Sequence, residues 1–205
     1  NNAGLMLDQR QESAQGHEAT FAINHLGPFL LTSLLTEQVV AAPRGRIVNV
    51  ASFAHQLAPR GIDWADIERR RHYRGWIVYG QSKLANILHA DELARRRAIT
   101  ARTALTVSPP GVVAHSLHPG SVASGFGRDG DLHGFNDRLL RVGRFVLITP
   151  EDGARTSVHL ASSADALRTT GDYWAKARRT RPSRAARDVL AAAELWRRSE
   201  QMVSE

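Results

Sequence analysis

Hydrophobic residues recur at helical spacing over several stretches of the chain, and turn-forming residues separate these stretches. Between residues 17 and 42 the apolar positions fall every three or four residues, until Pro43 and Gly45 end the pattern. A later stretch follows Pro150 and carries acidic residues in its first turn, which is typical of a helix N-terminus. We therefore predict helices over residues 17–42, 77–97, 136–146, 151–162 and 184–203.

Short runs of apolar and β-branched residues lie between these helical stretches. Residues 46–52 (Arg-Ile-Val-Asn-Val-Ala-Ser) and 112–117 (Val-Val-Ala-His-Ser-Leu) indicate buried strands, and residues 171–175 indicate a third. Residues 53–76 and 98–111 contain proline, glycine and polar residues. Both are predicted loops, the first with one helical turn.

The alternation of strands with helices of about 10–20 residues predicts an α/β fold. We expect one domain over residues 1–205, with a Rossmann-like, doubly wound parallel sheet and helices on both faces. In such sheets, ligands bind at the carboxyl ends of the strands. Ser52 ends one predicted strand, Pro119-Gly120 follows the next, and the helix over 77–97 connects the two. These features should therefore meet on one rim of the sheet.

The composition is ordinary for a soluble globular protein, with 42% hydrophobic and 23% charged residues. The positive charge behind the formal net charge of +7 is almost entirely arginine, and two arginine clusters stand out, in residues 69–71 and 178–187. A surface that stacks nucleic-acid bases would interleave aromatic residues with these arginines, and the chain does not. We interpret both clusters as solvated surface and expect no nucleic-acid partner.

Cysteine and histidine give little sign of metal or redox chemistry. The chain has no cysteine, and no histidine pair has a metal-ligand spacing with a nearby carboxylate, so no metal is expected. The histidines, His118 beside its turn included, are interpreted as packed, solvent-exposed or structural side chains. No apolar run reaches the ~20 residues that cross a bilayer. With no leader-like opening segment either, we expect a cytoplasmic protein without a transmembrane segment.

The candidate chemistry is carried by residues 79–83, Tyr-Gly-Gln-Ser-Lys, inside the predicted helix over 77–97. Tyr79 and Lys83 are four residues apart and share one helix face. A cation beside a phenol lowers its pKa from about 10, so that the phenol can act as an acid or base near neutral pH. With three tyrosines and only two lysines in the chain, chance would give only about 0.03 such matches.

Five segments, in this order and spacing, resemble the short-chain dehydrogenase/reductase family and, within it, its retinol-dehydrogenase-like branch. The segments are Asn2-Ala3-Gly4, residues 24–32 (Asn-His-Leu-Gly-Pro-Phe-Leu-Leu-Thr), residues 46–52, residues 79–86 (Tyr-Gly-Gln-Ser-Lys-Leu-Ala-Asn) and His118-Pro119-Gly120. Each segment alone is only moderately specific, whereas their combination is highly specific. The resemblance covers nearly the whole chain.

The resemblance implies four catalytic residues. Tyr79 would donate or accept the proton at the substrate oxygen, and Lys83 would lower its pKa and bind the nicotinamide ribose. Ser52 would hydrogen-bond the reacting carbonyl or alcohol, and Asn24 would support a water-linked proton path to Lys83. General chemistry agrees, because hydride leaves a carbinol carbon only as the hydroxyl proton leaves. No side chain carries hydride, so an NAD(P) cofactor must.

Other positions would contact this cofactor. The resemblance places Asn2, Ala3 and Gly4 near the adenosine ribose, Pro119, Gly120 and Val122 along the nicotinamide, and Ser124 near a phosphate or amide. The glycine-rich phosphate turn and the residue that selects NAD or NADP do not occur in these 205 residues. We therefore expect an N-terminally incomplete fold, with about 80–90 residues upstream of Asn1.

The expected function is an NAD(P)-dependent oxidoreductase that interconverts an alcohol and a carbonyl, on an apolar substrate. Two alternatives stay open. A truncated, catalytically impaired relative would serve as an interaction module, which the missing phosphate turn favours. An epimerase or dehydratase would use the same tyrosine-lysine pair. The helices over 17–42 and 77–97 resemble the family's dimer-forming pair, so a homo-oligomer is also expected.

Three further features bear on the site. Residues 125–130 match G-x-G-x-x-G, but they neither follow a strand directly nor open a helix, so we interpret them as part of a lid over the substrate. Residues 53–76 are interpreted as a wall of the substrate site. Pro28 lacks the N–H that the Asn24 carbonyl would otherwise accept, which would free that carbonyl for an ordered water.

Overall fold

The computed structural model of the chain describes residues 1–103, 112–120 and 148–204. Several predictions fall outside these residues. They are the helix over 136–146, the lid around residues 125–130, and the cofactor positions Val122 and Ser124.

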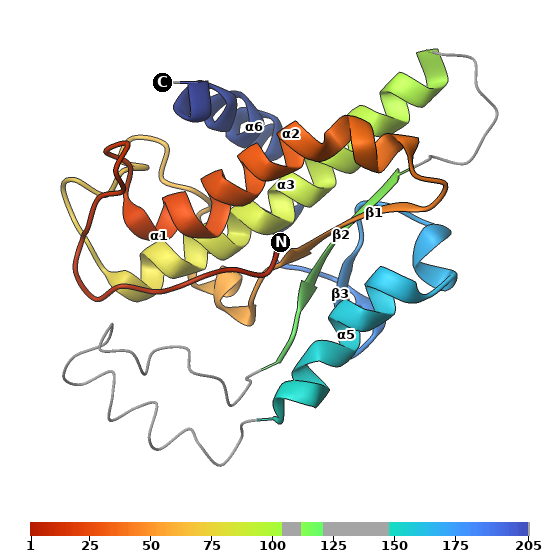
Figure 1. The fold of residues 1–205 in the computed structure, drawn as a ribbon. Coiled ribbons are helices and arrows are strands. Elements are labelled where there is room, and N and C mark those ends of the chain that lie inside the picture. Colours follow the sequence, from red (N-terminus) through yellow and green to blue (C-terminus); the bar gives the residue numbers. More distant parts are fainter. Residues whose placement is uncertain (104–111, 121–147, 205) are drawn as a thin grey trace.

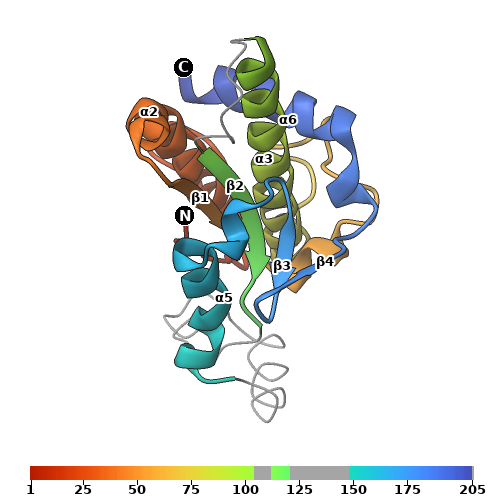
Figure 2. The ribbon, with the colours of Figure 1, turned by 90° about the vertical axis from the view of Figure 1, so that its right-hand side faces the viewer.

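The described strands form one sheet in the order β1-β2-β3-β4 (Figure 1; β4 is labelled in Figure 2). β1 (Gly45–Val50) and β2 (Val112–His118) are parallel, and β3 (Tyr173–Ala175) lies parallel to β2 on its other side. These three strands agree with the three that the sequence predicts, and the α/β class with a mainly parallel sheet is confirmed.

The strand β4 (Arg178–Thr180) was not predicted from the sequence. It returns antiparallel to β3 through a turn at Lys176 and Ala177, whose φ angles are 51° and 55°. Tight hairpin turns of this kind favour glycine, asparagine or aspartate at such positions. Because neither residue is of that type, the usual sequence signal for the hairpin is absent. The three residues of β4 are exposed, in agreement with the interpretation of this arginine cluster as surface.

Helices cover both faces of the sheet (Figure 2). On one face, Ile47 of β1 packs against Leu93 of α3 (Gly75–Thr103). On the other face, Val48 lies against a cluster that contains Leu160 of α5 (Pro150–Ser162). Alternate residues of β1 therefore point to opposite helical layers, as the pleat of a strand requires.

The predicted helix over residues 17–42 consists of three consecutive parts. They are α1 (Ala19–Phe21), the π-helical turn η1 (Ala22–Leu26) and α2 (Gly27–Ala41). The carboxylate of Glu18 caps the start, because it accepts hydrogen bonds from the backbone N–H groups of Thr20 and Phe21. The π turn ends at Leu26, two residues before Pro28, and such turns often mark functional sites. That the Asn24 carbonyl holds a water stays a prediction.

Two helix boundaries differ from the sequence prediction. The helix α3 runs to Thr103 rather than to residue 97, because residues 98–103 contain neither glycine nor proline to stop it. The last helix, α6 (Val189–Ser204), starts later than residue 184. Asp188 sets this start, since its side chain accepts hydrogen bonds from the N–H groups of Leu190 and Ala191.

The core lies mainly between α3 and its neighbours. Leu84 and Leu88 of α3 are fully buried and pack in one cluster with Leu195 of α6. The predicted loop over residues 53–76 contains a helical turn, the 3-10 helix η2 (Phe53–Leu57), which packs on α3. Among the described helices, none combines the length and apolar character needed to cross a membrane.

Candidate active site

Ser52 and Tyr79 meet at the carboxyl end of β1. Ser52 directly precedes η2, and its Oγ accepts the backbone N–H of Ala54 at 3.2 Å. A side-chain hydrogen bond joins Ser52 to Tyr79, in the first turns of α3. Gly80 allows this approach, because a Cβ there would lie 2.7 Å from the carbonyl oxygen of Ala54. The site therefore needs glycine after the tyrosine.

Lys83 lies one helical turn beyond Tyr79, with its Nζ 5.6 Å from the centre of the tyrosine ring. It is only 3% exposed and donates a hydrogen bond to the carbonyl oxygen of Val50 at 3.2 Å. Within the described residues, no carboxylate forms an ion pair with it. An ammonium has three donors, so this arrangement leaves donors for a bound molecule.

Burial acts on both titratable groups of this pair. It raises the pKa of Tyr79, while the hydrogen bond with Ser52 acts in the opposite direction. It also lowers the pKa of Lys83 to about 8, because a buried ammonium loses its hydration. Both groups therefore shift toward their neutral forms. The sequence prediction that Lys83 lowers the pKa of Tyr79 stays a prediction.

Asn24 lies fully buried in the π turn, where its side chain joins two segments. Its Nδ2 donates to Ser82 Oγ and to the carbonyl oxygen of Leu5, each at 2.9 Å, and its Oδ1 accepts the N–H of Leu5 at 2.8 Å. Gly4 fits tightly beside it, since a Cβ on Gly4 would lie 3.2 Å from Asn24 Oδ1 and 2.9 Å from Lys83 Nζ. The backbone at Gly4 therefore lies close to both the Asn24 side chain and the Lys83 ammonium.

The remaining predicted cofactor positions in the described residues lie next to the candidate site. Asn2 and Ala3 are exposed, between Asn1, which pairs with β1, and the buried contacts of Gly4. Pro119 and Gly120 follow β2 and are partly exposed. Their roles in cofactor binding stay predictions.

Three other polar residues make hydrogen bonds at the candidate site, and the sequence analysis gave none of them a catalytic or cofactor-binding role. Ser82 Oγ donates to the carbonyl oxygen of Tyr79 at 2.8 Å, and Asn86 Nδ2 donates to that of Val50 at 3.2 Å. The imidazole of His118 reaches the backbone that follows Ser52. Helical spacing was a usable signal for two of them, since Ser82 lies three residues after Tyr79 and Asn86 three residues after Lys83.

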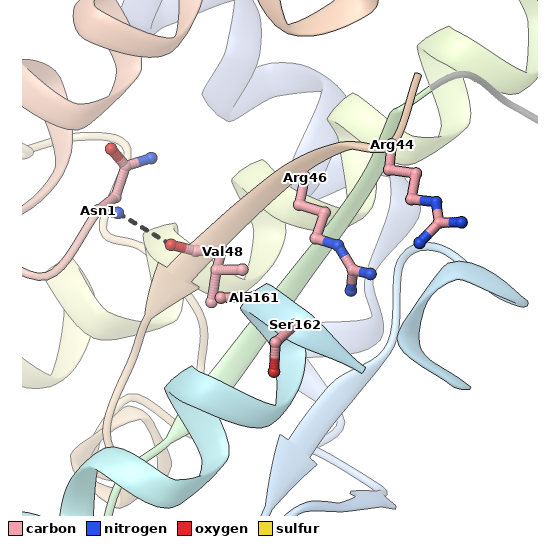
Figure 3. A pocket seen from close by; sticks show the side chains of 6 residues that line it. All are labelled: Asn1, Arg44, Arg46, Val48, Ala161 and Ser162. Atoms are coloured by element: carbon pink, nitrogen blue, oxygen red, sulfur yellow. Dashed lines mark hydrogen bonds between the residues drawn. The ribbon is translucent and has the colours of Figure 1, made fainter. Parts of the chain in front are cut away.

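A hollow of about 550 Å³ lies elsewhere, beside the outer edge of β1 (Figure 3). Its lining residues are Asn1, Arg44, Arg46, Val48, Ala161 and Ser162. Here Asn1 pairs with the strand, because its ammonium donates to Val48 O at 3.0 Å and the N–H of Val50 donates to its carbonyl at 2.9 Å. None of the four predicted catalytic residues lines this hollow. In the described part of the chain, no group of three side chains is arranged to bind a metal.

Comparisons with known proteins show similarity in sequence and in fold. Residues 1–63 match the family model described as short chain dehydrogenase. Human retinol dehydrogenase 11 is 35% identical over 196 residues, which cover 96% of this chain and 57% of that protein. The chain thus spans little more than half the length of this relative.

Solved structures show the same fold. An uncharacterised protein from Mycobacterium paratuberculosis superposes with a TM-score of 0.71 and 28% identity, over 98% of this chain and 64% of the other. The angucycline C-6 ketoreductase LanV with bound NADP superposes with a TM-score of 0.53 and 22% identity, over 84% and 57%. The family match over residues 1–63 and the retinol dehydrogenase relative, which is 35% identical over nearly the whole chain, support the identification of the chain as a retinol-dehydrogenase-like short-chain dehydrogenase/reductase.

Proposed function

We propose that this chain supplies the proton-transfer centre of an NAD(P)-dependent oxidoreductase that interconverts an alcohol and a carbonyl. The observation that carries the proposal is the hydrogen-bonded pair of Ser52 and Tyr79, with the buried ammonium of Lys83 one helical turn away. Family membership favours this chemistry. Because the chain spans 57% of its retinol dehydrogenase relative, the activity is proposed for the whole protein.

In this proposal Tyr79 moves the proton at the substrate oxygen. In the reducing direction its phenol donates to the carbonyl oxygen, and in the oxidising direction its phenolate accepts the hydroxyl proton. Ser52 donates a hydrogen bond to the same oxygen, where negative charge develops. Lys83 stabilises the phenolate through its positive charge, which opposes the effect of burial on the Tyr79 pKa.

The residues present fit a nicotinamide nucleotide, whose chemistry when bound is to accept or donate hydride. Lys83 is buried without a carboxylate partner among the described residues, and its free N–H donors suit the hydroxyl groups of a ribose. Gly4 has no side chain to cover that ammonium. The NADP bound to the ketoreductase LanV supports a nicotinamide cofactor here, without deciding between NAD and NADP.

The wall beside Ser52 supports an apolar substrate. Phe53 is 59% exposed and Leu57 is 43% exposed, although both are large hydrophobic residues. Exposed apolar groups next to polar chemistry are typical of binding sites. The name of the human relative, retinol dehydrogenase 11, is consistent with an apolar alcohol.

A homo-oligomer is part of the proposal. One stripe of α2 exposes large apolar side chains, which is typical of a surface that a partner covers. These side chains are Leu30, Leu31, Leu34 and Leu35. Sedimentation velocity of native protein and of a Leu34→Glu variant tests this part, since the charge should dissociate the oligomer. Sedimentation as a monomer at all concentrations would contradict it.

Cofactor titration and steady-state kinetics test the function. The chain and its full-length protein are titrated with NADH and NADPH, and saturable enhancement of cofactor fluorescence is expected in the full-length protein. Tyr79→Phe should bind the cofactor normally but lower kcat by about 10²–10⁴-fold, because a positioned acid is lost. Absence of cofactor binding in both forms would favour the interaction-module alternative. Turnover without net change in cofactor absorbance would favour an epimerase or dehydratase.

A further inference from the structure

His118 is the last residue of β2, and its ring joins two backbone segments that end neighbouring strands. Its Nδ1 accepts the N–H of Phe53 at 3.2 Å and the N–H of Gly120 at 3.4 Å. Phe53 directly follows Ser52, and Gly120 belongs to the turn predicted to line the nicotinamide. One nitrogen atom thus contacts the backbone on both sides of the candidate site.

The position of this contact extends the pairing between β1 and β2. The backbone ladder reaches the N–H of Ala51, which donates to the carbonyl oxygen of Leu117 at 2.8 Å. Beyond this hydrogen bond the two strands separate, the first into η2 and the second into the Pro119-Gly120 turn. The hydrogen bonds of the His118 imidazole then connect the two segments. The Phe53 and His118 rings also lie together, with centres 6.0 Å apart.

The contact requires one protonation state of the ring. A nitrogen that accepts two N–H groups carries no hydrogen, so the neutral ring must hold its proton on Nε2. Burial and the nearby His55 lower the pKa of His118, which favours the neutral ring. His55 itself is held in the same loop, where its Nδ1 lies 2.7 Å from the carbonyl oxygen of Ser52.

We propose that His118 is a positioning residue, whose Nδ1 fixes the backbone after Ser52 against the Gly120 turn and so sets Ser52 relative to the nicotinamide side of the site. The positioning of Ser52 for catalysis rests on the proposed function. The backbone connection itself does not, and it can be tested separately.

Two measurements on the full chain test the connection. In ¹⁵N NMR spectra with sequential assignment of the native chain, the His118 ring should be neutral with hydrogen on Nε2. Hydrogen exchange of the Phe53 amide should accelerate about tenfold in His118→Leu, since one hydrogen bond is lost. A native ring with hydrogen on Nδ1 overturns the proposal, even if every variant fails to fold.

Matched variants separate positioning from simple packing. The side-chain oxygen of asparagine can replace Nδ1, whereas that of glutamine lies nearer the position of Nε2. We therefore expect His118→Asn to keep native exchange of the Phe53 amide, and His118→Gln to behave like His118→Leu. Equal exchange rates in all three variants overturn the proposal.

The catalytic part is tested on the full-length protein. Its kcat/KM should fall about tenfold in the Leu and Gln variants and recover in the Asn variant. If the Asn variant does not recover while the NMR results hold, His118 does not position Ser52 for catalysis. If the native protein has no NAD(P)H-dependent turnover, the proposed function fails and the backbone connection stands on the NMR results.

Discussion

Asn24 and Ser82, which are 58 residues apart in the sequence, share a fully buried hydrogen bond in which Asn24 Nδ2 donates to Ser82 Oγ at 2.9 Å. Ser82 Oγ then donates to the carbonyl oxygen of Tyr79 at 2.8 Å. Asn24 also holds both backbone groups of Leu5. The asparagine therefore ties the N-terminal segment to the helix that carries Tyr79, independently of any role in proton transfer.

This connection predicts unequal losses of stability for two variants. Asn24→Ala removes three hydrogen bonds and leaves buried groups unpaired, so it should lower the free energy of unfolding by about 2–4 kcal/mol. Ser82→Ala removes two hydrogen bonds but leaves Asn24 bonded to Leu5, so it should cost less, about 1–2 kcal/mol. Urea denaturation of both variants measures the difference. Equal losses would mean that Asn24 does not organise the N-terminal segment.

Gly4 gives a second prediction, because a side chain there would meet Lys83. A Cβ at this position would lie 2.9 Å from Nζ, so Gly4→Ala should displace the ammonium and weaken NADH binding to the full-length protein about tenfold, as loss of one charged hydrogen bond would. The matched control is Gly27→Ala in α2, where a Cβ would only touch Ala22 O at 3.5 Å. Unchanged NADH affinity in Gly4→Ala would separate Gly4 from the cofactor site.

The pKa of Lys83 predicts a stability difference that depends on pH. Burial lowers this pKa from 10.5 to about 8, so the folded chain binds the proton less readily than the unfolded chain. Burying the charged lysine therefore lowers the free energy of unfolding. This loss of stability is complete below pH 8, and it disappears as the pH rises toward 10.5, since the unfolded lysine then loses its proton as well. Lys83→Met avoids this cost, and Val50 O keeps the hydrogen bond from Asn86.

We therefore expect Lys83→Met to be more stable than the native chain at pH 7, by up to about 3 kcal/mol. The gain should shrink steadily between pH 8 and pH 10. The matched control is Lys176→Met at the exposed lysine of the β3–β4 turn, whose effect should not change over this range. Denaturant titrations at each pH measure both variants. A gain that is constant with pH would show that Lys83 is not desolvated.

The strongest predictions from sequence concerned features that are local or periodic. The β1 strand, the α3 helix and the convergence of Ser52, Tyr79 and Lys83 follow from hydrophobic period, helical spacing and the rule that parallel strands place their carboxyl ends together. Each of these requires only the order of residues within one βαβ unit.

Contacts between distant segments were beyond sequence reasoning. The bond between Asn24 and Ser82 depends on how two helices pack, and the contact of His118 with Phe53 depends on how two strands end. The β3–β4 hairpin turns at Lys176 and Ala177, which have a left-handed backbone although neither is a residue type that favours it. In each case tertiary packing, rather than local preference, determines the geometry.

The buried histidines of the core give a further prediction, on acid stability. His25 and His89 lie against each other, with ring centres 5.8 Å apart and both fully enclosed. Burial lowers the pKa of His25 from 6.5 to about 3 and that of His89 to about 4, and the neighbouring ring adds to the effect on His25. Both rings are therefore neutral in the folded chain at neutral pH.

As the pH falls below 6.5, the unfolded chain binds protons at both histidines while the folded chain binds none until about pH 4. Stability should therefore fall with decreasing pH, with these residues contributing about 2.7 kcal/mol per pH unit well below pH 6.5. In His89→Asn, where the amide can replace Nδ1 beside Asn49, this slope should decrease by about 1.4 kcal/mol per pH unit whatever the absolute stability.

Urea denaturation of the native chain and the variant between pH 4 and pH 7 gives this slope directly. His72→Asn is the matched control, because His72 is exposed and its removal should leave the slope nearly unchanged. The comparison depends on slopes, so a cavity left by the smaller side chain shifts both ends of the curve equally and does not affect it. A native slope that His89→Asn does not change would mean that His89 is already protonated in the folded chain, or that it is hydrated there.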